Sequence, residues 1–272
     1  MIEKLIREEI DYFSPMLERQ KNTSEEVREA WRQETVAQRV ERVSLETYDL
    51  CNGLVSRGPF QGLKLNKDTW WGKSDLGSQC LGLYEAELLD LIASKGPFDT
   101  FLDIGAADGY YAVGMLHSKM AKQAICYEVS QDGQRAIKEN WLSNQSPGRM
   151  LIYGEANEES ITSIAPSLGS DSLVLIDVEG FEFSLLTSRV VSLLSRVKVI
   201  IEIHNWVPDF IQKYSSLLRR LDEHFEINVI EPSGRNTQQI DLLRSFTDDN
   251  RLLVASERRP CMMRFLFLEP KP

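Results

Sequence analysis

One short segment constrains the fold of this chain more than any other, Phe101–Leu116, which reads FLDIGAADGYYAVGML. Its first residues are apolar apart from one acid, Asp103, and are typical of a buried strand. Gly105 and Gly109 permit a tight turn and a close approach of the backbone to a ligand, and an apolar helix follows from Tyr110. The pattern predicts a strand that passes through a glycine turn into a helix, an arrangement suited to a nucleotide-like ligand.

The spacing of the glycines separates two kinds of cofactor. A dinucleotide site prefers three glycines, as G-x-G-x-x-G, with the pyrophosphate on the helix N-terminus. This turn has two glycines with Asp108 between them. Acids at Asp103 and Asp108 would repel a pyrophosphate but attract a sulfonium and an α-amino group. The motif therefore favours S-adenosylmethionine over a nicotinamide dinucleotide, and a plain turn fits poorly because it would bury an acid among apolar residues.

Two later segments supply further acids at predicted strand ends. The run AICYEVS, Ala124–Ser130, ends near Glu128, about one β-α-β unit after the first motif, where an acid accepts hydrogen bonds from ribose hydroxyls. The alternative for Glu128 is an acid in solvent. The third predicted strand, Met150–Ala156, would end beside the adenine, although Glu155 fits equally well as a first-turn acid of the next helix.

The candidate catalytic residues lie at the ends of the fourth and fifth predicted strands, Ser172–Glu182 and Lys198–Asn205. Ligands of open α/β sheets bind beyond the carboxyl ends of the strands. Glu202 and His204 are two residues apart and share one face of a strand, and the neighbouring strand would bring Asp177 close to both. We therefore expect these three side chains to meet.

Three interpretations of that group stay open. His204 could act as a general base, since its unperturbed pKa lies near neutrality and a carboxylate could orient its ring. Asp177, Glu202 and His204 could instead hold Mg²⁺, Mn²⁺ or a similar cation, which would acidify a substrate hydroxyl. The third interpretation is a structural ion pair that closes a strand end.

Charge and composition exclude other classes of function. The 272 residues include 31 basic and 41 acidic ones, for a net charge of −10, and no long basic block, so binding to a nucleic-acid backbone is disfavoured. We find neither a signal peptide nor an apolar run long enough for a bilayer, and we expect a cytoplasmic protein without a membrane partner. The widely spaced cysteines indicate reduced thiols: Cys51, Cys80, Cys126 and Cys261.

The predicted organisation is a helical extension, residues 1–54, followed by one enzyme-sized domain, residues 55–272. The extension could be a lid, a contact for homo-oligomers or a packing appendage, and packing is favoured. Val55–Gly77 predicts short strands and turns. It contains Trp70 and Trp71, for which packing is also favoured because buried tryptophans are commoner than exposed ones that stack on sugars.

Taken in order, these motifs resemble a known family. The segments GLYEAELL, FLDIGAADGYY, ICYEVS, LIDVEGFE and IIEIHN are similar to the FkbM-like branch of the class I S-adenosylmethionine-dependent methyltransferases. The resemblance covers residues 84–205, and its most specific part is the D-x-E-G-x-E pattern from Asp177 to Glu182. It implies a Rossmann-like α/β fold with a mostly parallel seven-stranded sheet and helices on both faces. Phe225–Pro232 and Met262–Pro270 can supply the last strands, one of them reversed.

The resemblance also implies a function, O-methylation of a hydroxyl on a saccharide or a small natural-product-like acceptor. The alternatives are a non-catalytic protein that binds the cofactor and acts through assembly, and a nicotinamide oxidoreductase, which the two-glycine turn disfavours. The cofactor contacts expected are Glu85, Asp103, Gly105, Ala106, Asp108, Gly109, Tyr110, Glu128, Val129, Glu155, Ala156 and Asp177.

Overall fold

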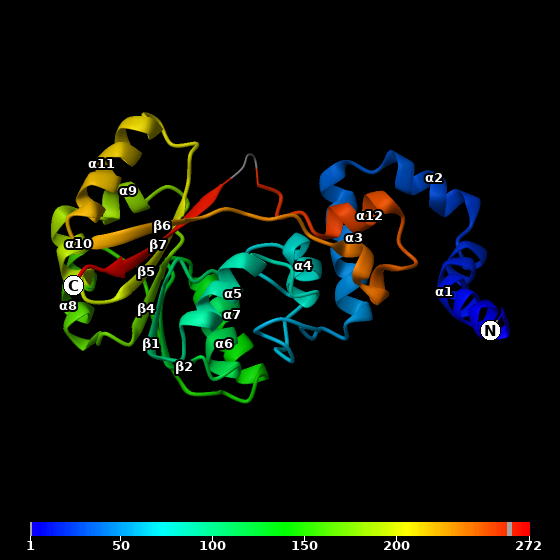
Figure 1. The fold of residues 1–272 in the computed structure, drawn as a ribbon, viewed down its shortest axis with the longest axis horizontal. Coiled ribbons are helices and arrows are strands. Elements are labelled where there is room, and N and C mark those ends of the chain that lie inside the picture. The colour runs from blue at the N-terminus through cyan, green and yellow to red at the C-terminus, as the bar shows by residue number, and fades with distance from the viewer. Residues whose placement is uncertain (1, 260–262) are drawn as a thin grey trace.

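The computed structural model describes residues 2–259 and 263–272, and its centre is a seven-stranded sheet in the order β3-β2-β1-β4-β5-β7-β6 (Figure 1). Six strands run in one direction, and β7 runs antiparallel between β5 and β6. The strands are β1 Phe98–Ile104, β2 Ala121–Tyr127, β3 Arg149–Tyr153, β4 Ser172–Ile176, β5 Lys198–Ile203, β6 Phe225–Ile230 and β7 Arg264–Pro270. The expected mostly parallel sheet with one reversed strand is confirmed.

Helices cover both faces of the sheet. One apolar core contains residues of α3 Val36–Leu50, α4 Leu76–Cys80, α5 Ala86–Lys95, α6 Tyr110–His117, α7 Gln131–Ser143 and α12 Asp248–Val254. The other contains residues of α8 Glu158–Ile164, α9 Glu182–Leu185, α10 Ser188–Leu194 and α11 Phe210–Asp222. Neighbouring strand residues point to opposite faces, so Phe101 packs in the first core and Leu102 in the second. The alternation explains why the strands are apolar on both sides.

Side-chain caps fix where several helices begin. Thr35 and Gln38 form a capping box at α3, and Asn157 and Ser160 form another at α8. Each pair satisfies two backbone N–H groups that the first turn of a helix leaves without partners. Ser130 caps α7 only three residues after β2 ends at Tyr127, so the turn from strand to helix is short.

The N-terminal helices are not equivalent. α1 Ile2–Asn22 and α2 Glu25–Gln33 extend away from the sheet, whereas α3 lies against α4 and α12 (Figure 1). The hydroxyl of Ser44 on α3 accepts a hydrogen bond from the Gly77 N–H at 2.7 Å and donates to the Lys73 carbonyl at 2.7 Å. A side chain at Gly77 would collide with the Ser44 backbone. α3 is therefore part of the packed body that adjoins the sheet.

Some element boundaries differ from the expectations. Residues 55–72 form turns with one isolated bridge between Leu54 and Lys64, and not short strands. The fourth strand ends at Ile176, because Glu179 and Gly180 have positive φ angles that leave the strand conformation. The last strand spans Arg264–Pro270.

Two expectations concern cysteines and membranes. Cys51, Cys80 and Cys126 are free and buried, as expected, while Cys261 and Met262 lie outside the described residues. Among the helices that the structure describes, none is both long and apolar enough to cross a bilayer.

Candidate active site

A cavity of about 410 Å³ opens at the carboxyl ends of β1, β2 and β4. Seven of its lining side chains are aromatic and six are acidic, which makes it a ring-lined and negatively charged site. The lining residues that the argument uses are Trp70, Trp71, Tyr110, Tyr111, Phe181, Asp103, Asp108, Glu128, Glu155, Asp177 and Glu179. Gly105, Ala106, Val129 and Ala156, all expected cofactor contacts, line it as well.

The glycine turn brings two strand ends together at the cavity floor. Gly105 has a φ of 90°, and a Cβ built there would lie 1.6 Å from the Asp177 carbonyl oxygen. The Asp177 N–H donates to the Ile104 carbonyl at 2.9 Å. Only glycine fits this contact between the ends of β1 and β4, and the contact sets the Asp177 side chain beside the turn. Gly109, with a φ of 78°, then begins α6.

Asp103 presents an unsatisfied acceptor to the cavity. Its side chain is 2% exposed, and its Oδ2 atom has no hydrogen-bond partner. Burial and the nearby charge of Asp177 raise the pKa of the Asp103 carboxyl to about 8. A cationic ligand that reached this carboxylate would repay part of the cost of burying it.

Glu128 stands at the end of β2, where the sequence places it. Its two oxygens accept hydrogen bonds from the Ala107 N–H at 2.9 Å and the Ser130 N–H at 2.7 Å. The side chain is 6% exposed and lines the cavity. Glu128 therefore ties the glycine turn to the start of α7 and still has free lone pairs for ligand hydroxyls.

Asp108 is engaged by the protein itself. Its Oδ1 accepts from the Trp70 N–H at 2.8 Å and its Oδ2 from the Trp71 N–H at 3.2 Å. Burial raises the pKa of Asp108. The sequence predicted that the Asp108 carboxylate would attract the sulfonium of the cofactor. In the structure it instead binds the backbone of Trp70 and Trp71, 38 and 37 residues earlier, at the rim of the cavity.

Both tryptophans at that rim are exposed, which differs from the packing favoured by the sequence. Trp70 is 38% and Trp71 48% exposed, and their ring centroids are 5.5 Å apart at an angle of 45°. Their backbone is held by Asp108, so the chain keeps them in place without burying their rings.

Glu85 lies behind the cavity and not among its lining residues. Its carboxylate pairs with the Arg259 guanidinium at 2.5 Å and accepts a hydrogen bond from the Tyr111 hydroxyl. Burial raises the pKa of Glu85 to about 8, against the opposing effect of Arg259. Glu85 acts on the cavity through Tyr111, whereas Tyr110 lines the cavity directly and has a buried hydroxyl without a partner.

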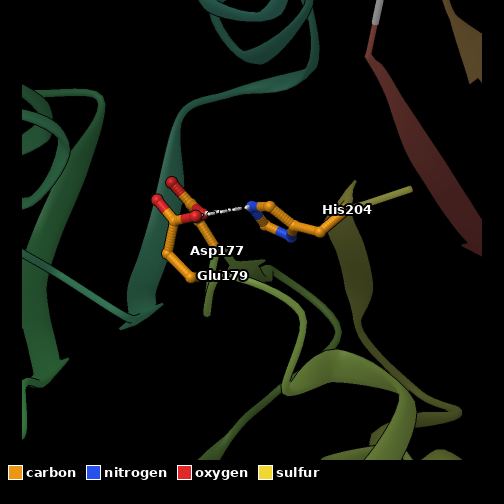
Figure 2. Close-up of side chains that lie close together, drawn as sticks. All are labelled: Asp177, Glu179 and His204. Atoms are coloured by element: carbon orange, nitrogen blue, oxygen red, sulfur yellow. Dashed lines mark ion pairs between the residues drawn. The ribbon is translucent and has the colours of Figure 1, made fainter. Parts of the chain in front are cut away.

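Four carboxylates lie close to the His204 ring, and Figure 2 shows two of them, Asp177 and Glu179, on the same side of the ring. Its Nε2 atom is 3.4 Å from Asp177 and 3.7 Å from Glu179, and its Nδ1 is 3.2 Å from both oxygens of Glu182. Glu202 approaches Nε2 to 3.8 Å. The structure therefore brings together the three residues predicted from the sequence, Asp177, Glu202 and His204, and adds Glu179 and Glu182.

The surroundings hold His204 in its charged form. Burial alone would lower its pKa, but hydrogen bonds and charges from Asp177 and Glu182 raise it to about 9. Carboxylate oxygens only accept hydrogen bonds, so Nδ1 carries the proton toward Glu182. At neutral pH the ring is an imidazolium, and it must lose the Nε2 proton before it can accept another.

Glu202 forms an ion pair with Arg259, a residue that the sequence analysis did not single out. The Arg259 guanidinium pairs with Glu202, with Glu85 and, at 3.0 Å, with Glu257. Burial raises the pKa of Glu202 well above its usual range, and Arg259 opposes that rise. No local pattern marks Arg259, because it lies 57 residues after Glu202 and outside any motif.

A different donor set from the expected one fits a divalent cation. One ligand atom each of Asp177, Glu179 and His204 lie within 4.8 Å of one another. Oxygen and imidazole donors at this separation suit Mg²⁺, Mn²⁺ or Zn²⁺. Glu202 stands apart from this set because Arg259 already neutralises it. The sequence signal for Glu179 was present in the D-x-E-G-x-E pattern, where it precedes the turn at Gly180.

No family model matches the chain, and no curated protein matches it. Several solved structures are similar in fold. The O-methyltransferase TomG from Streptomyces achromogenes, in complex with S-adenosylmethionine, is 14% identical with a TM-score of 0.45, over 68% of this chain and 79% of that one. Precorrin-6y C5,15-methyltransferase from Geobacter metallireducens is 12% identical with a TM-score of 0.44, over 67% and 87%. Precorrin 8w decarboxylase from Methanobacterium thermoautotrophicum is 13% identical with a TM-score of 0.43, over 68% and 88%. The fold of this chain is a Rossmann-like α/β fold, a mostly parallel seven-stranded sheet with helices on both faces.

Proposed function

We propose that this protein is an S-adenosylmethionine-dependent O-methyltransferase of the FkbM-like branch, acting on a hydroxyl of a small or saccharide acceptor. The observation that supports the proposal is that the cavity lined by the unsatisfied, buried Asp103 is also lined by Asp177 and Glu179, two carboxylates that contact the charged His204. Asp103 offers its free Oδ2 to the α-amino group of the cofactor, while Asp177 and Glu179 join the cavity to His204. Cofactor and base thus meet at the same strand ends.

The cofactor pocket follows from the lining residues. Glu128 would accept the ribose hydroxyls, and Val129, Glu155 and Ala156 would contact the adenine. Asp103 and Asp177, which both line the cavity, would face the amino-acid end of the cofactor. Methyl transfer is a direct displacement at the sulfonium carbon, and holding both reactants in line supplies much of the rate.

The histidine cluster would take the proton of the acceptor hydroxyl. A neutral alcohol is a poor nucleophile, so its proton must leave as the C–O bond forms. His204 at neutral pH carries a proton on Nε2, which Asp177 and Glu179 stabilise. The cluster accepts the hydroxyl proton only after the imidazolium has released its own to solvent, so transfer should accelerate as the pH rises toward 9.

A divalent cation at Asp177, Glu179 and His204 is the second way in which this cluster could act. A cation there would lower the pKa of a bound hydroxyl and orient it. The ion and the Nε2 proton compete for the same lone pair, so metal binding at neutral pH should release a proton. These residues hold the ion in that case, and Glu202 with Arg259 stays outside its ligand shell.

Isothermal titration of the purified protein with S-adenosylmethionine and S-adenosylhomocysteine tests the proposal. We expect binding of both, and loss of methyl transfer in His204→Ala while cofactor binding persists. Titrations with and without Mg²⁺ separate the two roles of the cluster, because only the metal role gives a metal-dependent affinity that Glu179→Gln removes. If neither ligand binds, the cofactor assignment is wrong.

A further inference from the structure

Trp70 and Trp71 form an exposed aromatic surface on the wall of the cavity. The two rings lie 5.5 Å apart at 45° and are 38% and 48% exposed, and both line the cavity that also contains Asp177 and Glu179. Exposed tryptophans cost free energy unless they pack on something, and large exposed aromatic patches mark binding sites. We call this pair the tryptophan platform; it belongs to the same cavity as the expected cofactor contacts, and the sequence assigned it no ligand contact.

The tryptophan platform is fixed in position. Asp108 accepts the backbone N–H groups of both tryptophans at 2.8 and 3.2 Å, from the loop that leads into α6. Just beyond the pair, the Lys73 carbonyl accepts the Ser44 hydroxyl of α3 at 2.7 Å. Because hydrogen bonds hold the backbone at and beyond the two tryptophans, a ligand that stacks on the rings loses little further conformational entropy of the protein. This is a feature of preorganised sites.

The charge of the cavity restricts what the platform can bind. Six carboxyl side chains line the cavity, and within the described ranges no lysine, arginine or histidine side chain does; the acids are Asp103, Asp108, Glu128, Glu155, Asp177 and Glu179. The cofactor brings one net positive charge, which leaves the site negative. An anionic acceptor would be repelled, because like charges that face each other across an interface disfavour binding.

We infer that the tryptophan platform stacks a flat ring face of the acceptor, and that the acceptor carries no negative charge. Uncharged rings are accepted, and a ring with an ammonium group is preferred, because tryptophan faces and carboxylates both attract cations. Phosphorylated and carboxylated acceptors are rejected. This inference rests on the proposed function for the identity of the site and adds the class of acceptor that the site selects.

Ligand-observed NMR on the full chain tests the inference. The protein is first saturated with S-adenosylhomocysteine, whose binding is measured separately by calorimetry. The probes are glucosamine, methyl glucoside, catechol and glucose 6-phosphate, compared at one pH by saturation transfer and titration. Glucosamine and methyl glucoside contain pyranose rings and catechol contains an aromatic ring. Comparing their affinities therefore also shows which kind of ring the tryptophan platform prefers.

The variants are Trp70→Ala/Trp71→Ala, the ring-preserving Trp70→Phe/Trp71→Phe, and Phe13→Ala as a matched control. Phe13 is 47% exposed on α1 and does not line the cavity. We expect the alanine pair to weaken ring binding roughly tenfold, with partial recovery in the phenylalanine pair and no change in the control. Glucose 6-phosphate should bind at least tenfold more weakly than glucosamine.

Three outcomes would overturn the inference. Equal or tighter binding of glucose 6-phosphate would contradict the charge argument. Unchanged probe binding in the alanine pair would show that the tryptophan platform does not bind the acceptor. The same would follow if the protein bound S-adenosylhomocysteine but none of the uncharged or cationic rings. If S-adenosylhomocysteine itself failed to bind the wild type, the proposed function would fail first, and the two failures are therefore distinguishable.

Discussion

The carboxylate of Glu182 accepts hydrogen bonds from both the backbone N–H and the ring Nδ1 of His204, at 3.0 and 3.2 Å. Glu182 is fully buried and His204 is 1% exposed. The acid therefore fixes the ring orientation and the position of its proton, and it turns the free Nε2 atom toward Asp177 and Glu179.

We predict that Glu182→Gln moves the pH dependence of methyl transfer to lower pH. The substitution removes a negative charge that helps to raise the pKa of His204 to about 9, so the imidazole loses its proton at a lower pH. The measurement is the pH profile of the transfer rate for wild type and variant. Glu226→Gln, at an exposed position on β6, is the matched control and should leave the profile unchanged. An unshifted profile in Glu182→Gln would show that His204 does not titrate in the reaction.

The same pair predicts a pH dependence of stability. A histidine with a raised folded pKa stabilises the protein below its unfolded pKa, near 6.5, and this contribution is lost as the pH rises to about 9. The difference in the free energy of unfolding between wild type and Glu182→Gln should be largest at pH 6 and should narrow toward pH 9. Urea denaturation at the two pH values measures it, and a difference independent of pH would contradict the assignment.

Binding of the cofactor should release a proton from Asp103. The pKa of Asp103 is about 8 in the free protein, so this carboxyl is largely neutral at pH 7 and must ionise to pair with an ammonium group. Calorimetry of S-adenosylhomocysteine in buffers of different ionisation enthalpy should therefore give different heats. Affinity should rise from pH 6 to pH 8. Asp103→Asn should lose this dependence and about 1 to 3 kcal/mol of binding free energy.

Arg259 should be a major source of stability. It pairs with Glu85, Glu202 and Glu257 in a largely buried network, and removal of one partner from such a network typically costs about 3 to 5 kcal/mol. Arg264→Met is the control, since Arg264 forms an exposed pair with Glu231 worth about 0 to 1 kcal/mol. Chemical denaturation compares Arg259→Met with this control. Equal stabilities would show that the network contributes nothing.

Asp108→Asn should loosen the tryptophan platform and leave the fold intact. The asparagine oxygen can still accept the Trp70 N–H, but its amide nitrogen would face the Trp71 N–H, donor against donor. We expect a small loss of stability, about 1 kcal/mol, and a change in tryptophan fluorescence. An unchanged spectrum would mean that the platform is held by other contacts.

Much of this fold follows from local sequence patterns. The strands β1, β2, β4 and β5 are apolar runs, and each glycine turn marks a strand end, so their order along the chain was predictable from spacing. Asp177, Glu202 and His204 were predictable for the same reason, because residues at the carboxyl ends of neighbouring parallel strands converge. These features are predictable because each strand and turn is determined by residues within a short stretch of the sequence.

The rest depends on contacts between distant segments. Arg259 lies 174 residues after its partner Glu85. The sequence around neither residue indicates that the two form an ion pair. Asp108 appeared to face a ligand because its loop does, yet its oxygens are used by the backbone of Trp70 and Trp71. The exposure of those tryptophans could not be derived from composition.

The position of Arg259 has a consequence for how the site forms. The chain is made from its N-terminus, so the acids Glu85 and Glu202 emerge before the guanidinium that neutralises them. The ion pairs of Glu85 and Glu202 can therefore form only after the chain has been made as far as Arg259. The network behind the cavity thus depends on one of the last segments of the chain to be synthesised.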